Sequence, residues 1–194
     1  MLTLIAPPAA EPVSLDEVKL HMRVDADDED LSIEGYLRTA RQKLDGQFGL
    51  LGRCLIAQSW RLTLDSFPSE IVLPLPPCIS IDRIAYLNAD GDEVDLAASA
   101  YRVTGIGGLH GARVRVAKGS AWPRTVETES VFVEFTAGFG PDPDDVPEPL
   151  RTAIKTHAAH LFEHRESVIL ASGFIAETPH GYDDMIRDYR MLEF

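Results

Sequence analysis

The stretch Gln58-Ser-Trp-Arg-Leu-Thr-Leu64 decides the fold class, because its apolar residues alternate with polar ones. Trp60, Leu62 and Leu64 then fall on one face of a β-strand. The same period recurs downstream, at Ile79, Ile81 and Arg83, at Arg113-Val-Arg-Val116, and at Val131, Val133 and Phe135. The pattern from Cys54 to Phe139 therefore predicts a half-buried antiparallel sheet.

Turn residues divide this stretch into strands. Asp90-Gly91, between Tyr86-Leu87 and Val94-Leu96, predicts a hairpin with a tight primed turn, in which both central residues prefer positive φ. Prolines at 68, 74, 76 and 77 predict edge strands or irregular connections, since proline cannot donate to a central ladder. The glycine-rich run 105–111 precedes a strand and not a helix, which favours a loop over a phosphate site.

Residues 12 to 50 predict two helices. Ser14-Leu-Asp-Glu17 is a capping box, and the helix that it begins should end near Arg23. The run Asp25 to Asp30 places negative charge at the start of the second helix, where the helix dipole favours it. Apolar residues recur at helical spacing along this second helix at Leu31, Tyr36, Leu37, Ala40 and Leu44, and Gly46 and Gly49 help to end it.

The C-terminal part predicts one long helix and one short one. Asp145 should cap the long helix, with Pro147 near its first position, and the helix should run to about Arg165. One face of it carries Leu150, Ile154, His157, Ala158 and Leu161. Residues 166–181 keep no sustained period, so we expect a flexible or partner-ordered segment before a last amphipathic turn or two, Tyr182 to Leu192.

Together these patterns predict an α+β protein in which N- and C-terminal helices form a helical body with an inserted antiparallel β module. The expected parts are an N-terminal helical part (1–53), the β module (54–140), the C-terminal helix (141–166) and a flexible C-terminal segment (167–194).

Composition narrows the function. Acidic residues outnumber basic ones by 31 to 18, giving a net charge of −13, which disfavours tight binding to DNA phosphates. The start MLTLIAPPAAEP carries no basic residue and too short an apolar run for a signal peptide, and no run of eighteen apolar residues occurs, so we expect a soluble, unexported protein. Cys54 and Cys78 have no Cys-x-x-Cys spacing and are expected to be reduced, buried thiols.

Several stretches spread over nearly the whole chain follow one another in a distinctive order. They are Glu11-Pro-Val-Ser-Leu-Asp-Glu-Val-Lys-Leu-His-Met-Arg-Val-Asp25, Gln58-Ser-Trp-Arg-Leu-Thr-Leu64, Leu73-Pro-Leu-Pro-Pro77, Tyr101-Arg-Val103, Trp122-Pro123, Phe135-Thr-Ala-Gly-Phe139, Val146-Pro-Glu-Pro-Leu150 and His160-Leu-Phe-Glu-His-Arg-Glu166. In this order the chain resembles the small head-to-tail connector (adaptor) proteins of tailed double-stranded DNA bacteriophages and gene transfer agents.

The resemblance implies a structural protein without catalytic residues, metal or cofactor. It implies a homo-oligomeric ring of about twelve copies between the portal of a DNA-filled capsid and a stopper or tail-completion protein. DNA would pass through the lumen without sequence-specific binding, and an acidic lumen would let it slide. The protein would be made in the bacterial host cytoplasm and end at the head-tail junction of a phage, a prophage remnant or a gene transfer agent.

Two surfaces follow from the resemblance as expectations. The ring interface is expected at Leu37, Arg41, Leu44, His157, Leu161, His164 and Arg165. The portal-contacting segment is expected at Tyr182, Met185, Ile186, Tyr189, Arg190, Leu192 and Phe194.

Other functions remain open on the residues alone. His160, Glu163 and His164 match the inverted zinc-peptidase pattern H-x-x-E-H, which makes a zinc-dependent hydrolase the enzymatic alternative. The acidic runs 25–30 and 88–92 could interest calcium, although neither has the spacing of an EF-hand loop. A carbohydrate-binding β module would instead expose an aromatic row made of Trp60, Trp122, Phe132 and Phe135.

Overall fold

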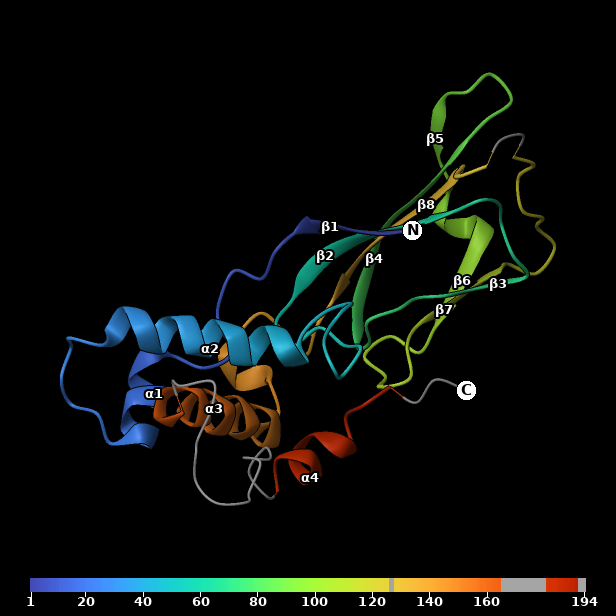
Figure 1. Cartoon of the computed structure of the whole chain (residues 1–194). Helices are drawn as coiled ribbons and strands as arrows, with labels where there is room; N and C mark the ends of the chain where they lie inside the picture. Colours follow the sequence, from blue (N-terminus) through green and yellow to red (C-terminus); the bar gives the residue numbers. More distant parts are fainter. Residues whose placement is uncertain (126–127, 165–180, 192–194) are drawn as a thin grey trace, which may run out of the picture. The chain divides into compact units, whose positions relative to one another are not determined.

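The structure, a computed structural model, describes residues 1–125, 128–164 and 181–191 (Figure 1). It divides the chain into two units. The β unit consists of Met1–Ala9 and Arg53–Pro141, and the helical unit of Ala10–Gly52 and Asp142–Phe194. The predicted α+β class is confirmed: all antiparallel strands but the first lie in sequence between N-terminal and C-terminal helices.

The larger sheet of the β unit has five antiparallel strands in the order β1-β2-β8-β4-β5. These are β1 (Leu2–Ala6), β2 (Gln58–Leu64), β4 (Cys78–Leu87), β5 (Glu93–Asp95) and β8 (Val131–Ala137). β8 is central, with Trp60 of β2 and Ile81 of β4 opposite Phe135. The strand predicted from residues 58–64 is therefore present, next to the centre of the sheet.

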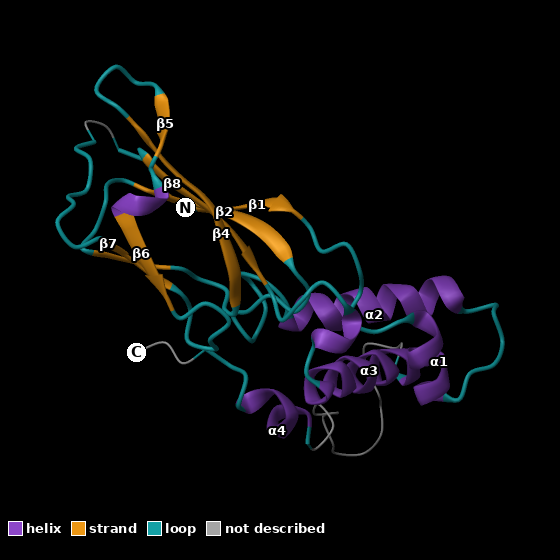
Figure 2. Cartoon of the chain, turned by 180° about the vertical axis from the view of Figure 1, so that it is seen from behind, coloured by secondary structure: helices purple, strands orange, loops and turns teal. Residues whose placement is uncertain are grey.

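A second, three-stranded sheet has the order β3-β7-β6. Figure 2 shows its strands β6 and β7 side by side. Its strands are β3 (Glu70–Val72), β6 (Tyr101–Thr104) and β7 (Arg113–Val116), and a short 3₁₀ helix, η1 (Ala98–Ala100), leads into β6. Ile71 and Val114 join Val133 and Phe135 in one buried cluster. Alternate residues from both sheets thus form a common core, as in a β-sandwich.

The helical unit contains α1 (Leu15–Met22), α2 (Asp30–Leu44), α3 (Glu148–Glu163) and α4 (Tyr182–Arg187), with η2 (Pro143–Asp145) before α3. α1, α2 and α3 pack against one another and α4 packs on α3. The predicted capping box is confirmed, since Ser14 and Glu17 bond each other's backbone N–H groups. α1 ends at Met22, and Arg23 follows with a φ of 60°. Among the described residues no helix has both the length and the apolar character to cross a membrane.

The N-terminal boundary predicted at residue 53 differs from the structure. Residues 2–6 form β1, which pairs with β2, so Met1–Ala9 belongs to the β unit. The missed signal was Leu2-Thr-Leu-Ile-Ala6, a short apolar run that we weighed only as a signal peptide.

The expected start of the long helix is also corrected. Asp145 does not cap α3, whose N-cap residue is Pro147. Asp145 instead accepts a hydrogen bond from the backbone N–H of Asp142 in the preceding turn. The helix ends at Glu163, two residues before the predicted end.

Two predicted strand details are wrong for local reasons. β4 has irregular register between Cys78 and Ser80 and between Ile81 and Arg83, so strict alternation fails and Ile79 is exposed. The 88–92 hairpin exists, but only Gly91 has positive φ, and the Asn88 side chain organises the turn by accepting two backbone N–H groups.

Shortening a buried side chain of the central strand, β8, tests this core. Phe135→Ala should lower the free energy of unfolding by about 3–5 kcal/mol, because the ring is fully buried and a cavity would replace it. Phe48→Ala, which truncates a ring 94 % exposed, should change it by less than about 0.5 kcal/mol. Urea titration followed by circular dichroism measures both, and equal losses would contradict the core assignment.

Candidate interaction surfaces

Three of the residues expected at the ring interface are buried inside the helical unit. Leu37 and Leu44 lie on the face of α2 that packs against α3, and His157 is on α3. Their exposed fractions are 4 %, 0 % and 6 %. Side chains with so little exposed surface can add little to a contact with another copy, so these three belong to the intramolecular core.

The other expected ring residues are partly accessible. Arg41 contacts the carboxylates of Glu11 and Asp45 at 2.8 and 3.1 Å, which ties the end of α2 to the segment before α1. Leu161 is half-buried and His164 is exposed. Arg165 lies outside the described residues.

Burial gives His157 a distinctive environment. Its ring centroid lies 5.4 Å from that of Tyr182, which comes from α4. Desolvation lowers the pKa of His157 to about 4, with the nearby charges of Lys43 and His160 acting in the same direction. The imidazole is therefore neutral in the folded protein at neutral pH.

Part of the expected portal segment is buried in the chain's own core. Tyr182 and Ile186 are buried, whereas Met185 and Tyr189 are half-buried and Arg190 is exposed. Leu192 and Phe194 lie outside the described residues, as does most of the segment expected to be flexible. Of the expected portal residues in the described chain, Met185 on α4 and Tyr189 and Arg190 just after it thus remain accessible to a partner.

Exposed apolar side chains mark surface that the sequence analysis missed. Leu20 at the end of α1, Leu31 at the start of α2 and Phe48 after α2 are 81 %, 83 % and 94 % exposed. Leu31 was expected on the inner face. Helical geometry could have corrected this, because Leu31 lies two positions before the buried Ile33 and hence on roughly the opposite side of the helix.

Glu17 links the first and third helices. Its Oε1 accepts a hydrogen bond from Arg151 at 2.6 Å while its Oε2 completes the capping box. Burial opposes ionisation of Glu17, but hydrogen bonds from Ser14 and the charges of Arg151 and Lys155 outweigh it and lower the pKa. The pair joins residues 134 positions apart in the sequence.

The residues of the zinc pattern do not form a recognisable metal site. The rings of His160 and His164 lie 4.5 Å apart, and Nδ1 of His164 lies 3.0 Å from the His160 carbonyl oxygen. Within residues 1–125, 128–164 and 181–191, no group of three or more His, Cys, Asp or Glu side chains is placed to hold a metal ion.

The acidic runs weighed for calcium have other structural roles. Lys19 on α1 binds Asp27 and Asp30, both at 2.7 Å. In the second run Asn88 organises the β4–β5 turn.

The aromatic row expected of a carbohydrate-binding module is absent from the described β unit. Trp60 and Phe135 are buried, and Trp122 stacks on Phe67 with centroids 4.8 Å apart. Phe132 lies under the guanidinium of Arg61.

The fold and the surfaces together define an α+β protein that is similar over its whole length to chains of gene transfer agent (GTA) particles. A chain in the neck of an empty GTA particle, computed with C6 symmetry, is 23 % identical with a TM-score of 0.78. A chain in the virion of a native gene transfer agent (GTA) particle is 24 % identical with a TM-score of 0.79. A third, in the neck of a native GTA particle computed with C12 symmetry, is 23 % identical with a TM-score of 0.76. Each alignment covers 100 % of this chain and 97 % of the other.

The family comparison agrees with the fold. Residues 12–85 match the model of the phage gp6-like head-tail connector protein family. The resemblance to head-to-tail connectors inferred from the sequence is thereby confirmed. No curated protein is significantly similar to the chain.

The buried histidine generates a pH prediction. His157 binds a proton at a pKa of about 4 when folded but near 6.5 when unfolded, so its contribution to stability is complete above pH 6.5 and is lost as pH falls towards 4. We expect roughly 2–3 kcal/mol of the free energy of unfolding to be lost through this group between pH 6.5 and 4.5.

Two variants show how much of the pH dependence of stability comes from His157. His157→Phe should abolish most of that slope, whereas His164→Phe, at an exposed position of the same helix, should leave it unchanged. Chemical denaturation at half-unit pH steps measures the slope. Equal slopes in wild type and His157→Phe would show that other groups cause the pH dependence.

Proposed function

We propose that this protein is a structural head-to-tail connector that forms a ring in the neck of a phage-like particle. The observation that carries the proposal is the match of residues 12–85 to the head-tail connector family within a fold shared end to end with chains of GTA necks. A neck computed with C12 symmetry supports a ring of about twelve copies. No catalytic role is proposed.

Contacts between copies in a ring require accessible side chains whose burial lowers the free energy of the assembly. Phe48 is the proposed anchor, because its ring is 94 % exposed and aromatic residues often anchor interfaces. Leu161, His164 and the accessible part of Arg41 remain proposed ring residues, together with Arg165. Leu37, Leu44 and His157 are buried in the helical unit and are therefore excluded from the proposed interface.

The portal is the proposed partner on one side of the ring and a stopper or tail-completion protein on the other. Met185, Tyr189 and Arg190 are the proposed portal contacts of the described chain, with Leu192 and Phe194 beyond them. Arg190 lies 3.5 Å from Asp183, a distance at which an exposed ion pair contributes little, so the guanidinium is available to a partner at small cost.

The proposed ring would enclose a channel for DNA. With a net charge of −13 per copy, a lumen in which acidic side chains outnumber basic ones would repel phosphates and let DNA slide. A basic lumen in an assembled ring would contradict this part of the proposal.

The test is the mass of the purified chain, alone and mixed with its cognate portal, measured by light scattering with zinc quantified on the same sample. We expect a ring alone or a stable complex with the portal. A metal-free monomer that ignores the portal would contradict the connector function, and stoichiometric zinc would support the hydrolase alternative.

Phe48→Ser should weaken assembly at least about tenfold, because it removes an apolar anchor of the proposed interface. Gln42→Ser, at another exposed position of the helical unit, should assemble like wild type. Both variants should unfold at the wild-type denaturant concentration, since neither side chain is buried. Normal assembly of Phe48→Ser would remove Phe48 from the ring interface.

A further inference from the structure

The outward face of the three-stranded sheet carries an arginine cluster whose geometry follows from strand register. Glu70 of β3 lies opposite Arg115 of β7, and Arg115 lies opposite Arg102 of β6. The next row contains Val72, Arg113 and Thr104. We call these six residues the arginine face.

One carboxylate serves two of the three arginines. Glu70 binds Arg113 at 2.7 Å and Arg115 at 2.5 Å. The hydrogen bonds from Arg115 and Arg113 lower the pKa of Glu70, so its charge is retained. Arg102 has no ion pair within the described chain, although it stands directly across from Arg115, where like charges destabilise a sheet. The arginine face therefore holds an excess of positive charge that an external anion would relieve.

A pocket lies beside Arg102 and Arg115 of the arginine face. Its lining is Arg102, Thr104, Arg115 and Val116, with a volume of about 140 Å³. Two guanidinium groups and a hydroxyl are donors suited to a carboxylate, which arginine binds in a bidentate manner. Val72, 49 % exposed in the same two rows, adds an apolar contact.

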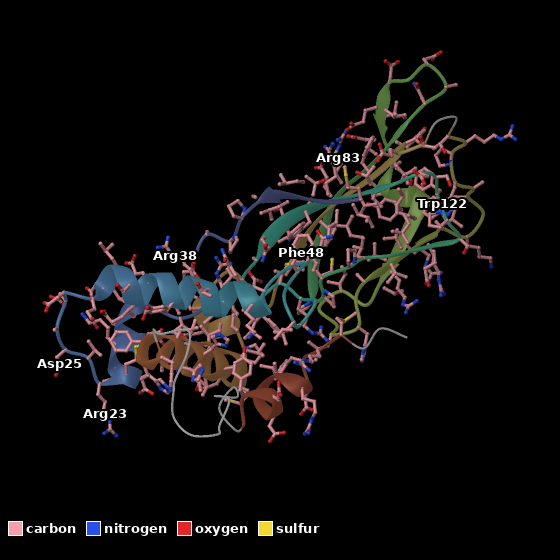
Figure 3. All side chains as sticks on the ribbon, viewed as in Figure 1. Arg23, Asp25, Arg38, Phe48, Arg83 and Trp122 are labelled. Carbon is pink, nitrogen blue, oxygen red and sulfur yellow. The ribbon has the colours of Figure 1, made fainter. Side chains whose placement is uncertain are left out.

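The same chain offers a complementary surface. Figure 3 shows Arg23 and Asp25 at the turn between α1 and α2. Lys19 forms ion pairs with Asp27 and Asp30, but Asp25 and Asp28 are exposed and form no ion pair with described residues. Leu20 and Leu31 flank this turn and are also exposed. Acidic and apolar groups thus occur together here, as basic and apolar groups do on the arginine face.

We propose that the arginine face binds the acidic α1–α2 turn of a second copy of this chain, with Asp25 and Asp28 as the entering carboxylates. The inference rests on the proposed ring, in which a surface of each copy meets a different surface of the next. Nucleic acid is the weaker occupant, because DNA phosphates would approach a chain with a net charge of −13.

A charge swap tests the contact, with copies bound per portal and self-association both measured by light scattering. Arg102→Glu should weaken assembly at least about tenfold, and Asp25→Arg with Asp28→Arg should do the same. The triple variant should recover most of the loss, because the charges again match. Arg38→Glu, at an exposed arginine of α2 whose Nε lies 3.4 Å from the Glu34 carbonyl oxygen, is the matched control and should assemble normally.

The outcomes separate the inference from the proposed function. Unimpaired assembly of Arg102→Glu, or no recovery in the triple variant, would overturn the contact while leaving the connector function intact. A wild-type chain that stays monomeric with and without portal would overturn both. Duplex DNA binding that Arg102→Glu abolishes, with self-association unchanged, would assign the arginine face to nucleic acid and overturn the proposal.

Discussion

The pairing of β8 with β2 on one side and β4 on the other is the constraint on which the rest of the structure depends. Alternate residues of β8 are fully buried, namely Val131, Val133, Phe135 and Ala137. The residues between them face outward, where Glu134 binds Arg61 of β2. Because a slip of one residue would exchange the two faces, this register fixes the core and the surface of the β unit together.

The helical unit is made of two stretches of chain that the β unit separates in sequence, so it depends on packing between these two stretches. Burial of one face of α2 against α3 supplies most of the contact between them. The Glu17–Arg151 pair adds orientation more than free energy, because it ties the capped start of α1 to the first turns of α3. Leu37, Leu44 and His157 lie in this helix packing, which is why they have almost no exposed surface.

Patterns of short range predicted much of this fold, and contacts of long range account for what they missed. The capping box, the shared core-facing side of Trp60, Leu62 and Leu64 in β2, and the buried face of α3 depend on neighbours in sequence, and all three are present. β1 was not predicted, because a stretch of five residues is too short to show a clear period before its partner strand is known. The interaction surfaces were harder, since the apolar residues of a helix do not reveal which of them meet the chain's own core. The arginine face depends on the register of three short strands, which the sequence does not specify.

Few basic side chains are available on this surface for contacts with other molecules. The chain has 31 acidic and 18 basic residues, and many of the described basic side chains already bind acids within their own unit. Copies that approach one another therefore repel at long range, and only local matches of positive charge and apolar surface can hold them. A portal that presents adjacent binding sites would raise the effective concentration of subunits enough to offset that repulsion. The acidic balance that would keep DNA mobile in the proposed channel would thus make the proposed ring assemble more strongly on a portal than between free copies.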